Sequence, residues 1–158
     1  MIVSVDTNIL LDILLPDPMY KDTSMALLVH YIKAGRIIIS DIVYSELASQ
    51  FKNQAMLTGF LNDTGIQLVG FTTEALWISA KAWEKYLKTR DKSIQCSCCG
   101  WREIIKCPSC HQVITSKQHI LSDFLIAGHA VVESGTLLTR DRGFYKTYFP
   151  ELKLICGI

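Results

Sequence analysis

Acidic residues that lie far apart in the sequence follow short apolar stretches typical of buried strands. Asp6 directly ends the stretch MIVSV, and Asp141 comes two residues after the stretch TLLT. Asp123 lies at the start of one helical segment, and Glu46 lies about two turns into another. Carboxylates that meet at one site repel each other unless cations neutralise them, and hard cations such as Mg²⁺ prefer oxygen ligands. Because a bound divalent ion can acidify a water molecule and stabilise charge on a phosphoryl oxygen, this set suits phosphodiester hydrolysis.

Three of these acids also have an ordinary structural explanation. An Asp at a helix N-terminus, such as Asp123, is commonly a cap or a partner of the helix dipole. Glu46 fits the solvated face of a helix, and Asp6, within the stretch VDTN, fits a turn. The metal-site interpretation therefore depends on all four acids reaching one edge of the same sheet.

The elements that must position these acids are predicted by apolar runs that alternate with helical periodicity. Short strands are expected at 1–5, 36–40, 66–70, 136–139 and 153–155, and helices at 7–15, 20–35, 41–51, 53–65, 72–90, 122–135 and 143–149. In the long helix at 72–90, the predicted apolar face consists of Leu76, Ala80, Trp83 and Leu87. Alternating strands and helices indicate an α/β fold, with a parallel sheet of five strands flanked by helices on both faces. Ligands of such sheets bind beyond the carboxyl ends of the strands, which is where the acids lie.

Five of the six cysteines fall within sixteen residues, QCSCCGWREIIKCPSC, in a region without helical periodicity. Two Cys-x-x-Cys pairs supply four candidate zinc ligands: Cys96, Cys99, Cys107 and Cys110. We expect one structural Zn²⁺ bound by these four thiolates, with the segment GWREIIK forming a tight hairpin or loop between the pairs. Cys98 and His111 are spare ligands, and a disulfide pair or an iron–sulfur site are the alternatives. Cys156 is expected to be a buried thiol.

The region around the cysteines is locally basic. Between Lys81 and Gln118, eight Lys and Arg stand against three Asp and Glu, which gives this segment a net charge of +5. Such a segment beside an acidic metal site could follow a phosphate backbone or could simply be a solvated face. Four cations are the candidates for RNA contact: Arg102, Lys106, Arg140 and Arg142. Trp101 either stacks on a base or packs over the zinc site, and the two arginines beside Asp141 either contact RNA or balance the carboxylates.

The totals for the chain set only wide limits on function. The chain has 158 residues, 49% of them hydrophobic, with a formal net charge of +1, so global charge favours neither nucleic acid nor membranes. The first residues do not resemble a secretory signal. No apolar run reaches the roughly 18 residues that a membrane-spanning helix requires. We therefore expect a cytoplasmic protein without a membrane partner.

Four motifs together resemble PIN-domain proteins, and in particular the VapC-like toxins of type II toxin–antitoxin systems. They are MIVSVDTNILLDIL, SDIVYSEL, SDFLIAGHA and LLTRDRGFYKTYFPELKLI, in the order that this family shows. The resemblance implies a PIN-type sandwich around a five-stranded parallel sheet, and a ribonuclease that depends on Mg²⁺ or Mn²⁺. Its acidic quartet would be Asp6, Glu46, Asp123 and Asp141, supported by Asn8 and Thr139. It also implies a homodimer that a cognate antitoxin protein inhibits.

One segment departs from the family's usual pattern. The cysteine-rich region, residues 91–118, occupies the place of a short link, so we expect a single PIN domain spanning 1–158 with a small zinc-ribbon-like insert. The main hypothesis is a metal-dependent endoribonuclease, the toxin of a toxin–antitoxin pair. The alternatives are a zinc-stabilised RNA-binding module and a ribosomal-RNA maturation nuclease, although in the latter the zinc ribbon follows the PIN domain instead of interrupting it.

Overall fold

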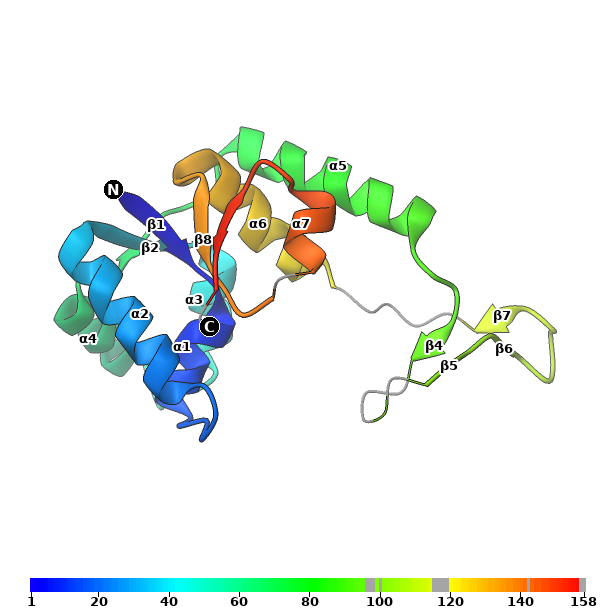
Figure 1. Ribbon diagram of the computed structural model, residues 1–158, viewed down its shortest axis with the longest axis horizontal. Coiled ribbons are helices and arrows are strands. Elements are labelled where there is room, and N and C mark those ends of the chain that lie inside the picture. Colours follow the sequence, from blue (N-terminus) through cyan, green and yellow to red (C-terminus); the bar gives the residue numbers. More distant parts are fainter. Residues whose placement is uncertain (96–98, 100, 115–119, 142, 157–158) are drawn as a thin grey trace.

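The computed structural model describes residues 1–95, 99, 101–114, 120–141 and 143–156. At its centre lies a parallel sheet of five strands in the order β3-β2-β1-β8-β9 (Figure 1). Its strands are β1 (Ile2–Val5), β2 (Arg36–Ile39), β3 (Gln67–Leu68), β8 (Thr136–Leu138) and β9 (Lys153–Ile155). The predicted α/β fold is therefore confirmed. The three inner strands are buried along almost their whole length, as continuous apolar runs covered on both faces should be.

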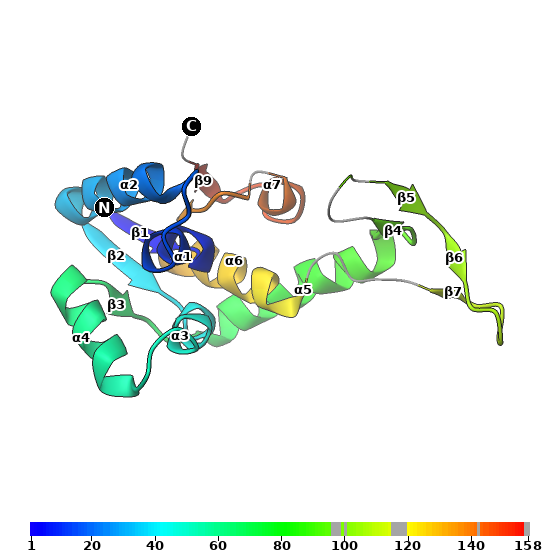
Figure 2. The ribbon, with the colours of Figure 1, turned by 90° about the horizontal axis from the view of Figure 1, so that it is seen from below.

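Helices cover both faces of this sheet. They are α1 (Thr7–Leu14), α2 (Lys21–Ala34), α3 (Asp41–Ala48), α4 (Gln54–Thr64), α5 (Thr73–Thr89), α6 (Leu121–Glu133) and α7 (Phe144–Tyr148). α2 packs against β2, whereas α6 packs against β1 and β8 on the opposite side (Figure 2). Side-chain caps fix several helix starts: Ser40, Asn53 and Thr72 each accept a hydrogen bond from a backbone N–H of the first turn. Among the helices that the structure describes, none has the length and apolarity to cross a membrane.

The buried face of α5 matches the predicted face only at Trp83, which packs against Phe124 of α6, while the other predicted members are exposed. Leu76 is 44% exposed and Leu87 is 42% exposed, while the residues that face α6 are Ala75, Ser79, Ala82 and Tyr86. The physical reason is the close approach of α6 at Gly128. A Cβ atom at Gly128 would lie 2.0 Å from Ser79 Oγ and 2.7 Å from the carbonyl oxygen of Ala75. Small side chains therefore line this helix contact, and the larger apolar residues of α5 lie beside it.

The region between α5 and α6 forms an arm, defined here as residues 94–114 (Figure 1). It contains two antiparallel pairs: β4 (Ile94–Gln95) with β5 (Arg102–Glu103), and β6 (Ile105–Lys106) with β7 (Val113–Ile114). The prediction of a tight hairpin or loop for GWREIIK is wrong. Its residues 102–106 include β5 and β6, which pair outward with different strands instead of turning back on each other.

Candidate active site

The site begins where two neighbouring strands end. β1 and β8 pair in a register that sets Val5 beside Leu138, and the N–H of Asp6 donates to the carbonyl of Leu138 at 2.9 Å. The next residues along both strands, Asp6 and Thr139, therefore lie side by side. Thr139 Oγ1 donates to Asp6 Oδ2 at 2.6 Å, although the two residues are 133 positions apart in the sequence.

Two further side chains donate to the same carboxylate oxygen. Asn8 Nδ2 lies 2.7 Å from Asp6 Oδ2, and the hydroxyl of Tyr145 lies 3.2 Å from it. Asn8 also contacts Thr139 Oγ1 at 3.2 Å, and its own Oδ1 accepts from the N–H of Arg140. The predicted supporting residues Asn8 and Thr139 thus fix the orientation of Asp6 and of the loop that follows β8.

Burial makes the carboxyl group of Asp6 a weaker acid than usual. The side chain is almost inaccessible to water, and this burial is the main reason that the pKa of Asp6 is raised from 3.8 to about 6. The hydrogen bonds from Thr139 and Tyr145 act in the opposite direction and lower the pKa. The charge of Asp123 raises it further. Burial likewise raises the pKa of Tyr145 far above its usual value. The charges of Asp6, Asp123 and Asp141 add to that rise. The negative charge of three predicted site residues therefore acts on one buried hydroxyl.

Asp123 and Asp141 each serve a backbone role as well. Asp123 lies in the first turn of α6, and its Oδ2 accepts from the N–H of Ile120 at 3.2 Å, so the capping explanation holds alongside the electrostatic one. Asp141 Oδ1 accepts from the N–H groups of Gly143 and Phe144, each at 3.0 Å, at the start of α7. These bonds fix both carboxylates near the site.

Glu46 reaches the same edge from α3. It is half-buried, and its Oε2 accepts a hydrogen bond from Thr7 Oγ1, the residue directly after Asp6. The helix α3 starts immediately after β2, which pairs with β1, so sheet order brings Glu46 towards Asp6. Glu46 is therefore not a residue of the solvated helix face.

The donor set suits a hard divalent cation, although the ligands are not gathered around one point. Among the described residues, no group of three or more His, Cys, Asp and Glu side chains lies close enough to hold a metal ion as it stands. The chemistry nevertheless fits, because the site offers carboxylate, hydroxyl and amide oxygens. Burial is the main cause of the raised pKa values of Asp6 and Tyr145, and neighbouring carboxylates, including Asp123, add to both rises, so a cation bound here would offset part of this negative charge.

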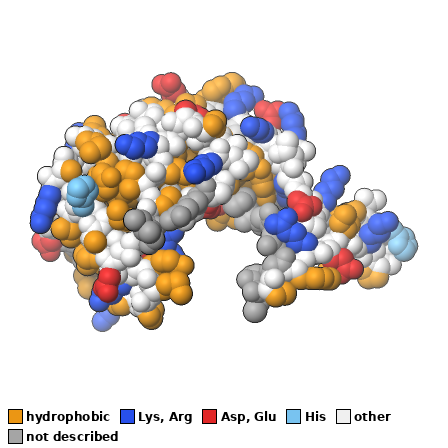
Figure 3. Space-filling model, viewed as in Figure 1, with side chains coloured by type: hydrophobic (Ala, Val, Ile, Leu, Met, Phe, Trp, Pro, Cys, Tyr) orange, Lys and Arg blue, Asp and Glu red, His pale blue; other side chains and the backbone are white. Residues whose placement is uncertain are grey.

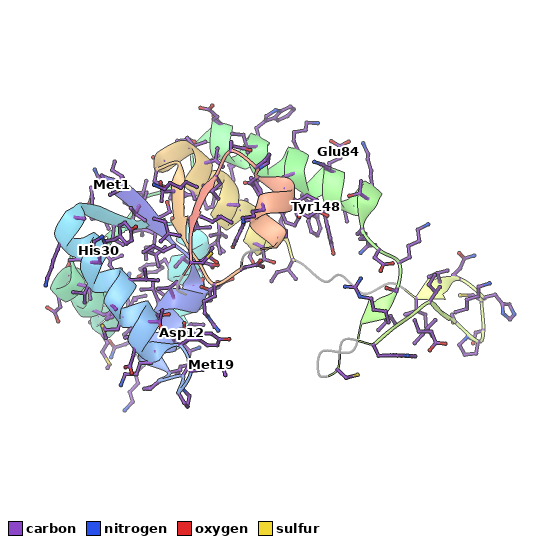
Figure 4. The ribbon with its side chains drawn as sticks, in the orientation of Figure 1. Met1, Asp12, Met19, His30, Glu84 and Tyr148 are labelled. Carbon is purple, nitrogen blue, oxygen red and sulfur yellow. The ribbon has the colours of Figure 1, made fainter. Side chains whose placement is uncertain are left out.

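Of the predicted RNA contacts, Arg140 has a structural partner inside the body. One of its guanidinium nitrogens lies 3.0 Å from Oδ1 of Asp12, a side chain that is 2% exposed. Ser24 Oγ donates to the other Asp12 oxygen at 2.6 Å, and the guanidinium lies 4.3 Å from the centre of the Tyr20 ring. Figure 4 shows Asp12 between α1 and α2. Arg140 thus balances a carboxylate, but not one of the predicted four.

The other predicted RNA contacts lie on or near the arm or outside the described residues. Arg102 lies 3.6 Å from a carboxylate oxygen of Asp91, and both side chains are about half exposed. Lys106 is exposed on β6. Arg142 falls outside the described residues.

The described cysteines of the two pairs lie at different places along the arm. Cys99 is exposed in the loop before β5, whereas Cys107 and Cys110 lie in the loop after β6. The five residues 102–106 separate the loops, and at about 3.3 Å a residue an extended segment of that length spans about 16 Å. Cys96 and Cys98 fall outside the described residues. Cys156 is half-buried, not buried as expected.

Three residues of this region were not predicted from the sequence. Tyr145 and Thr7 contact the predicted acids directly, and Asp12 anchors the loop that carries Asp141 through Arg140. Only Asp12 has a clear sequence signal, since a single acid within the apolar helix TNILLDIL requires a buried partner.

An acidic edge at the carboxyl ends of a parallel sheet defines an α/β protein with a candidate metal site. Residues 3–98 match the model of the PIN domain, which is more than half of the chain. The chain therefore belongs to the PIN domain family, whose members are typically nucleases. The matched span includes Asp6 and Glu46 and ends before Asp123 and Asp141. Among curated proteins, none matches this chain in sequence.

Solved structures share the fold. VapBC2 from Rickettsia felis, bound to a DNA fragment from its promoter, is 20% identical with a TM-score of 0.62, and the match covers 100% of both chains. VapBC-1 from nontypeable Haemophilus influenzae is 16% identical with a TM-score of 0.61, over 99% of this chain and 98% of the other. FitAcB from Neisseria gonorrhoeae is 20% identical with a TM-score of 0.57, over 98% and 96%. Likeness at this level of identity establishes the fold.

Proposed function

We propose that this protein is a metal-dependent endoribonuclease that hydrolyses RNA phosphodiester bonds. The observation that carries the proposal is the buried Asp6 carboxylate, held by Thr139, Asn8 and Tyr145 where β1 and β8 end. A carboxylate that is buried, raised in pKa and acted on by the charge of a second acid indicates a functional site more often than a structural one. The PIN domain family supplies the reaction class.

In this proposal, Asp6, Glu46, Asp123 and Asp141 hold Mg²⁺ or Mn²⁺. A divalent ion bound there would acidify a water molecule and stabilise charge on the phosphoryl group as the 3′ oxygen leaves. Thr139 and Asn8 orient Asp6 through its Oδ2. Thr7 orients Glu46 in the same way, and burial beneath α7 excludes bulk water from the inner side of the site.

The proposed biological role is that of a toxin, acting in the cytoplasm and controlled by a separate antitoxin protein, with the toxin forming a homodimer. The motifs shared with VapC-like toxins support this role. The fold shared with VapBC2, VapBC-1 and FitAcB agrees with it.

We also propose that residues 91–118 bind a structural Zn²⁺ through Cys96, Cys99, Cys107 and Cys110. Support comes from the turn at Cys107: hydrogen bonds from the backbone of Cys110 and Ser109 lower the pKa of the Cys107 thiol, which favours the thiolate that binds metal. One ion could reach both pairs only if the arm folded back near Ile104, because β5 and β6 now separate the two loops.

The nuclease proposal is tested by incubating a mixed RNA pool with protein that has been dialysed free of Mg²⁺ and Mn²⁺. Cleavage should appear when either ion is added and should fall to background in Asp6→Ala. Asp63→Asn is the matched control, since it removes an exposed carboxylate on α4, and it should cut as the wild type does.

Two results would count against the proposal. Cleavage by Asp6→Ala at the wild-type rate would show that the acidic edge is not the catalytic site. A folded wild-type protein that binds RNA but never cuts it would instead support the RNA-binding module.

A further inference from the structure

The arm is a part of the molecule that the proposed chemistry does not use. We propose that it holds single-stranded RNA at the approach to the acidic edge, an inference that rests on the proposed nuclease function. In the sequence, the arm lies between α5 and α6. These two helices pack against each other, and α6 carries Asp123 in its first turn.

The arm rejoins the body close in sequence to one of the predicted site acids. The chain re-enters the body at Ile120, whose N–H binds the carboxylate of Asp123. Figures 1 and 2 show the strands of the arm extending beyond the C-terminal end of α5, and Figure 3 shows a wide hollow between the arm and the body. A polymer that crosses this hollow would contact the arm on one side and the edge of the body on the other.

The charge of this region complements a phosphate backbone. From residue 81 to residue 114, seven Lys and Arg stand against three Asp and Glu, a net charge of +4, which leaves −3 for the rest of the chain. Glu84 is already paired with Lys81 at 3.1 Å and with Lys88 at 2.6 Å, on the outer surface of α5 (Figure 4). The acidic edge itself repels a polyanion, so attraction must arise at exposed cations along this region, such as Lys92 and Lys106.

The arm also exposes an aromatic ring. Trp101 is 56% exposed, directly before Arg102, and Lys106 lies further along the same extended segment. Aromatic rings next to cations are the pattern with which proteins hold unpaired nucleotides, because every base has a face on which an indole can stack. Base faces are hidden inside a duplex, so this pattern selects a single strand.

A binding experiment tests the inference in an inactive parent, full-length Asp6→Asn, without Mg²⁺ or Mn²⁺. Fluorescence anisotropy measures its affinity for a labelled 20-nucleotide single strand and for a duplex of equal length. The parent should prefer the single strand. Trp101→Ala should weaken binding by about fivefold or more, and Trp101→Phe should restore it, since phenylalanine also stacks. Arg102→Glu with Lys106→Glu should make the dependence of log affinity on log salt shallower by about one to two.

Matched controls separate the arm from the rest of the surface. Trp77→Ala removes an indole that is 65% exposed on α5, and Lys33→Glu reverses an exposed charge on α2. Both should bind as the parent does. Parent-like binding by Trp101→Ala, or equal binding of duplex and single strand, would overturn the inference. These results do not depend on cleavage, whereas a wild type that binds through the arm and cuts no RNA with Mn²⁺ would refute only the nuclease.

Discussion

Asp6→Asn should abolish cleavage and, in the same molecule, stabilise the metal-free fold. The two effects have one cause, because the carboxylate that the proposed chemistry requires is also a buried negative charge. The amide keeps nearly the same shape, and its oxygen can still accept from Thr139 and Tyr145. The ionisation is removed, and one carboxylate oxygen is replaced by an amide nitrogen.

The magnitude follows from the pKa of this group. A rise from 3.8 to about 6 is roughly two units, and at 1.36 kcal/mol for each unit it corresponds to about 3 kcal/mol. This is an upper limit for the gain in the free energy of unfolding, because the amide nitrogen must find a partner in the site. For a chain of this length it corresponds to a melting temperature higher by roughly 6–12 °C.

The gain must depend on pH in one direction. The pKa of Asp6 is higher in the folded than in the unfolded state, so folding is penalised when the group is ionised. Below pH 3.8 the carboxyl is protonated in both states and carries no penalty. Wild-type stability is therefore lost relative to Asp6→Asn as the pH rises from about 4 to about 6, and the difference stays constant above that range.

Urea unfolding followed by tryptophan fluorescence at pH 4 and at pH 7.5, in buffer without Mg²⁺ or Mn²⁺, measures both quantities. Added Mn²⁺ should raise the stability of the wild type more than that of Asp6→Asn. Asp63→Asn, which changes the same charge on the exposed side of α4, should be neutral. A variant no more stable than the wild type at pH 7.5, or an advantage that is equally large at pH 4, would refute this account of Asp6.

Three further changes test other parts of the structure. Gly128→Ala should lower the free energy of unfolding by about 2–3 kcal/mol because its Cβ would collide with α5. The control Gly59→Ala lies in open space on α4 and should raise the free energy of unfolding by about 0.5–1 kcal/mol. Equal urea midpoints for the two variants would contradict the close helix contact. Arg140→Ala should destabilise the fold by about 2 kcal/mol by leaving the carboxylate of Asp12 buried without its ion pair, and Asp12→Ala in the same chain should recover part of the loss in urea unfolding. Cys107→Ser should lower the zinc content measured by atomic absorption, and an unchanged content would rule out its role as a ligand.

The sheet could be predicted from the sequence because each strand is a short apolar run between helical segments. Buried parallel strands carry this signal locally, so their positions and the placing of Asp6 and Thr139 follow without knowledge of tertiary contacts. The family motifs then supplied a set of acids to examine at the strand ends.

What could not be predicted depends on contacts between distant segments. The buried face of α5 is set by Gly128, some fifty residues later in the chain, which selects Ser79 over the larger neighbours that periodicity favours. Tyr145 gives no signal as a partner of Asp6, because a tyrosine in a short amphipathic helix is usually only part of the core. The arm was misjudged because strands of two residues have no measurable periodicity, and only their pairing shows where the chain turns.

The insertion point of the arm divides the candidate active site in sequence but not in space. Asp6 and Glu46 precede the arm, and Asp123 and Asp141 follow it, yet β1 pairs with β8 and α5 packs along α6 across the division. A chain cut once within the arm would therefore yield two fragments, each with half of the carboxylates, that remain joined through the sheet and the helix pair. The fold is in this sense built from two packed halves, with β3, β2 and β1 in one and β8 and β9 in the other, and the arm is the place where one gene could be split into two whose products reassemble the sheet.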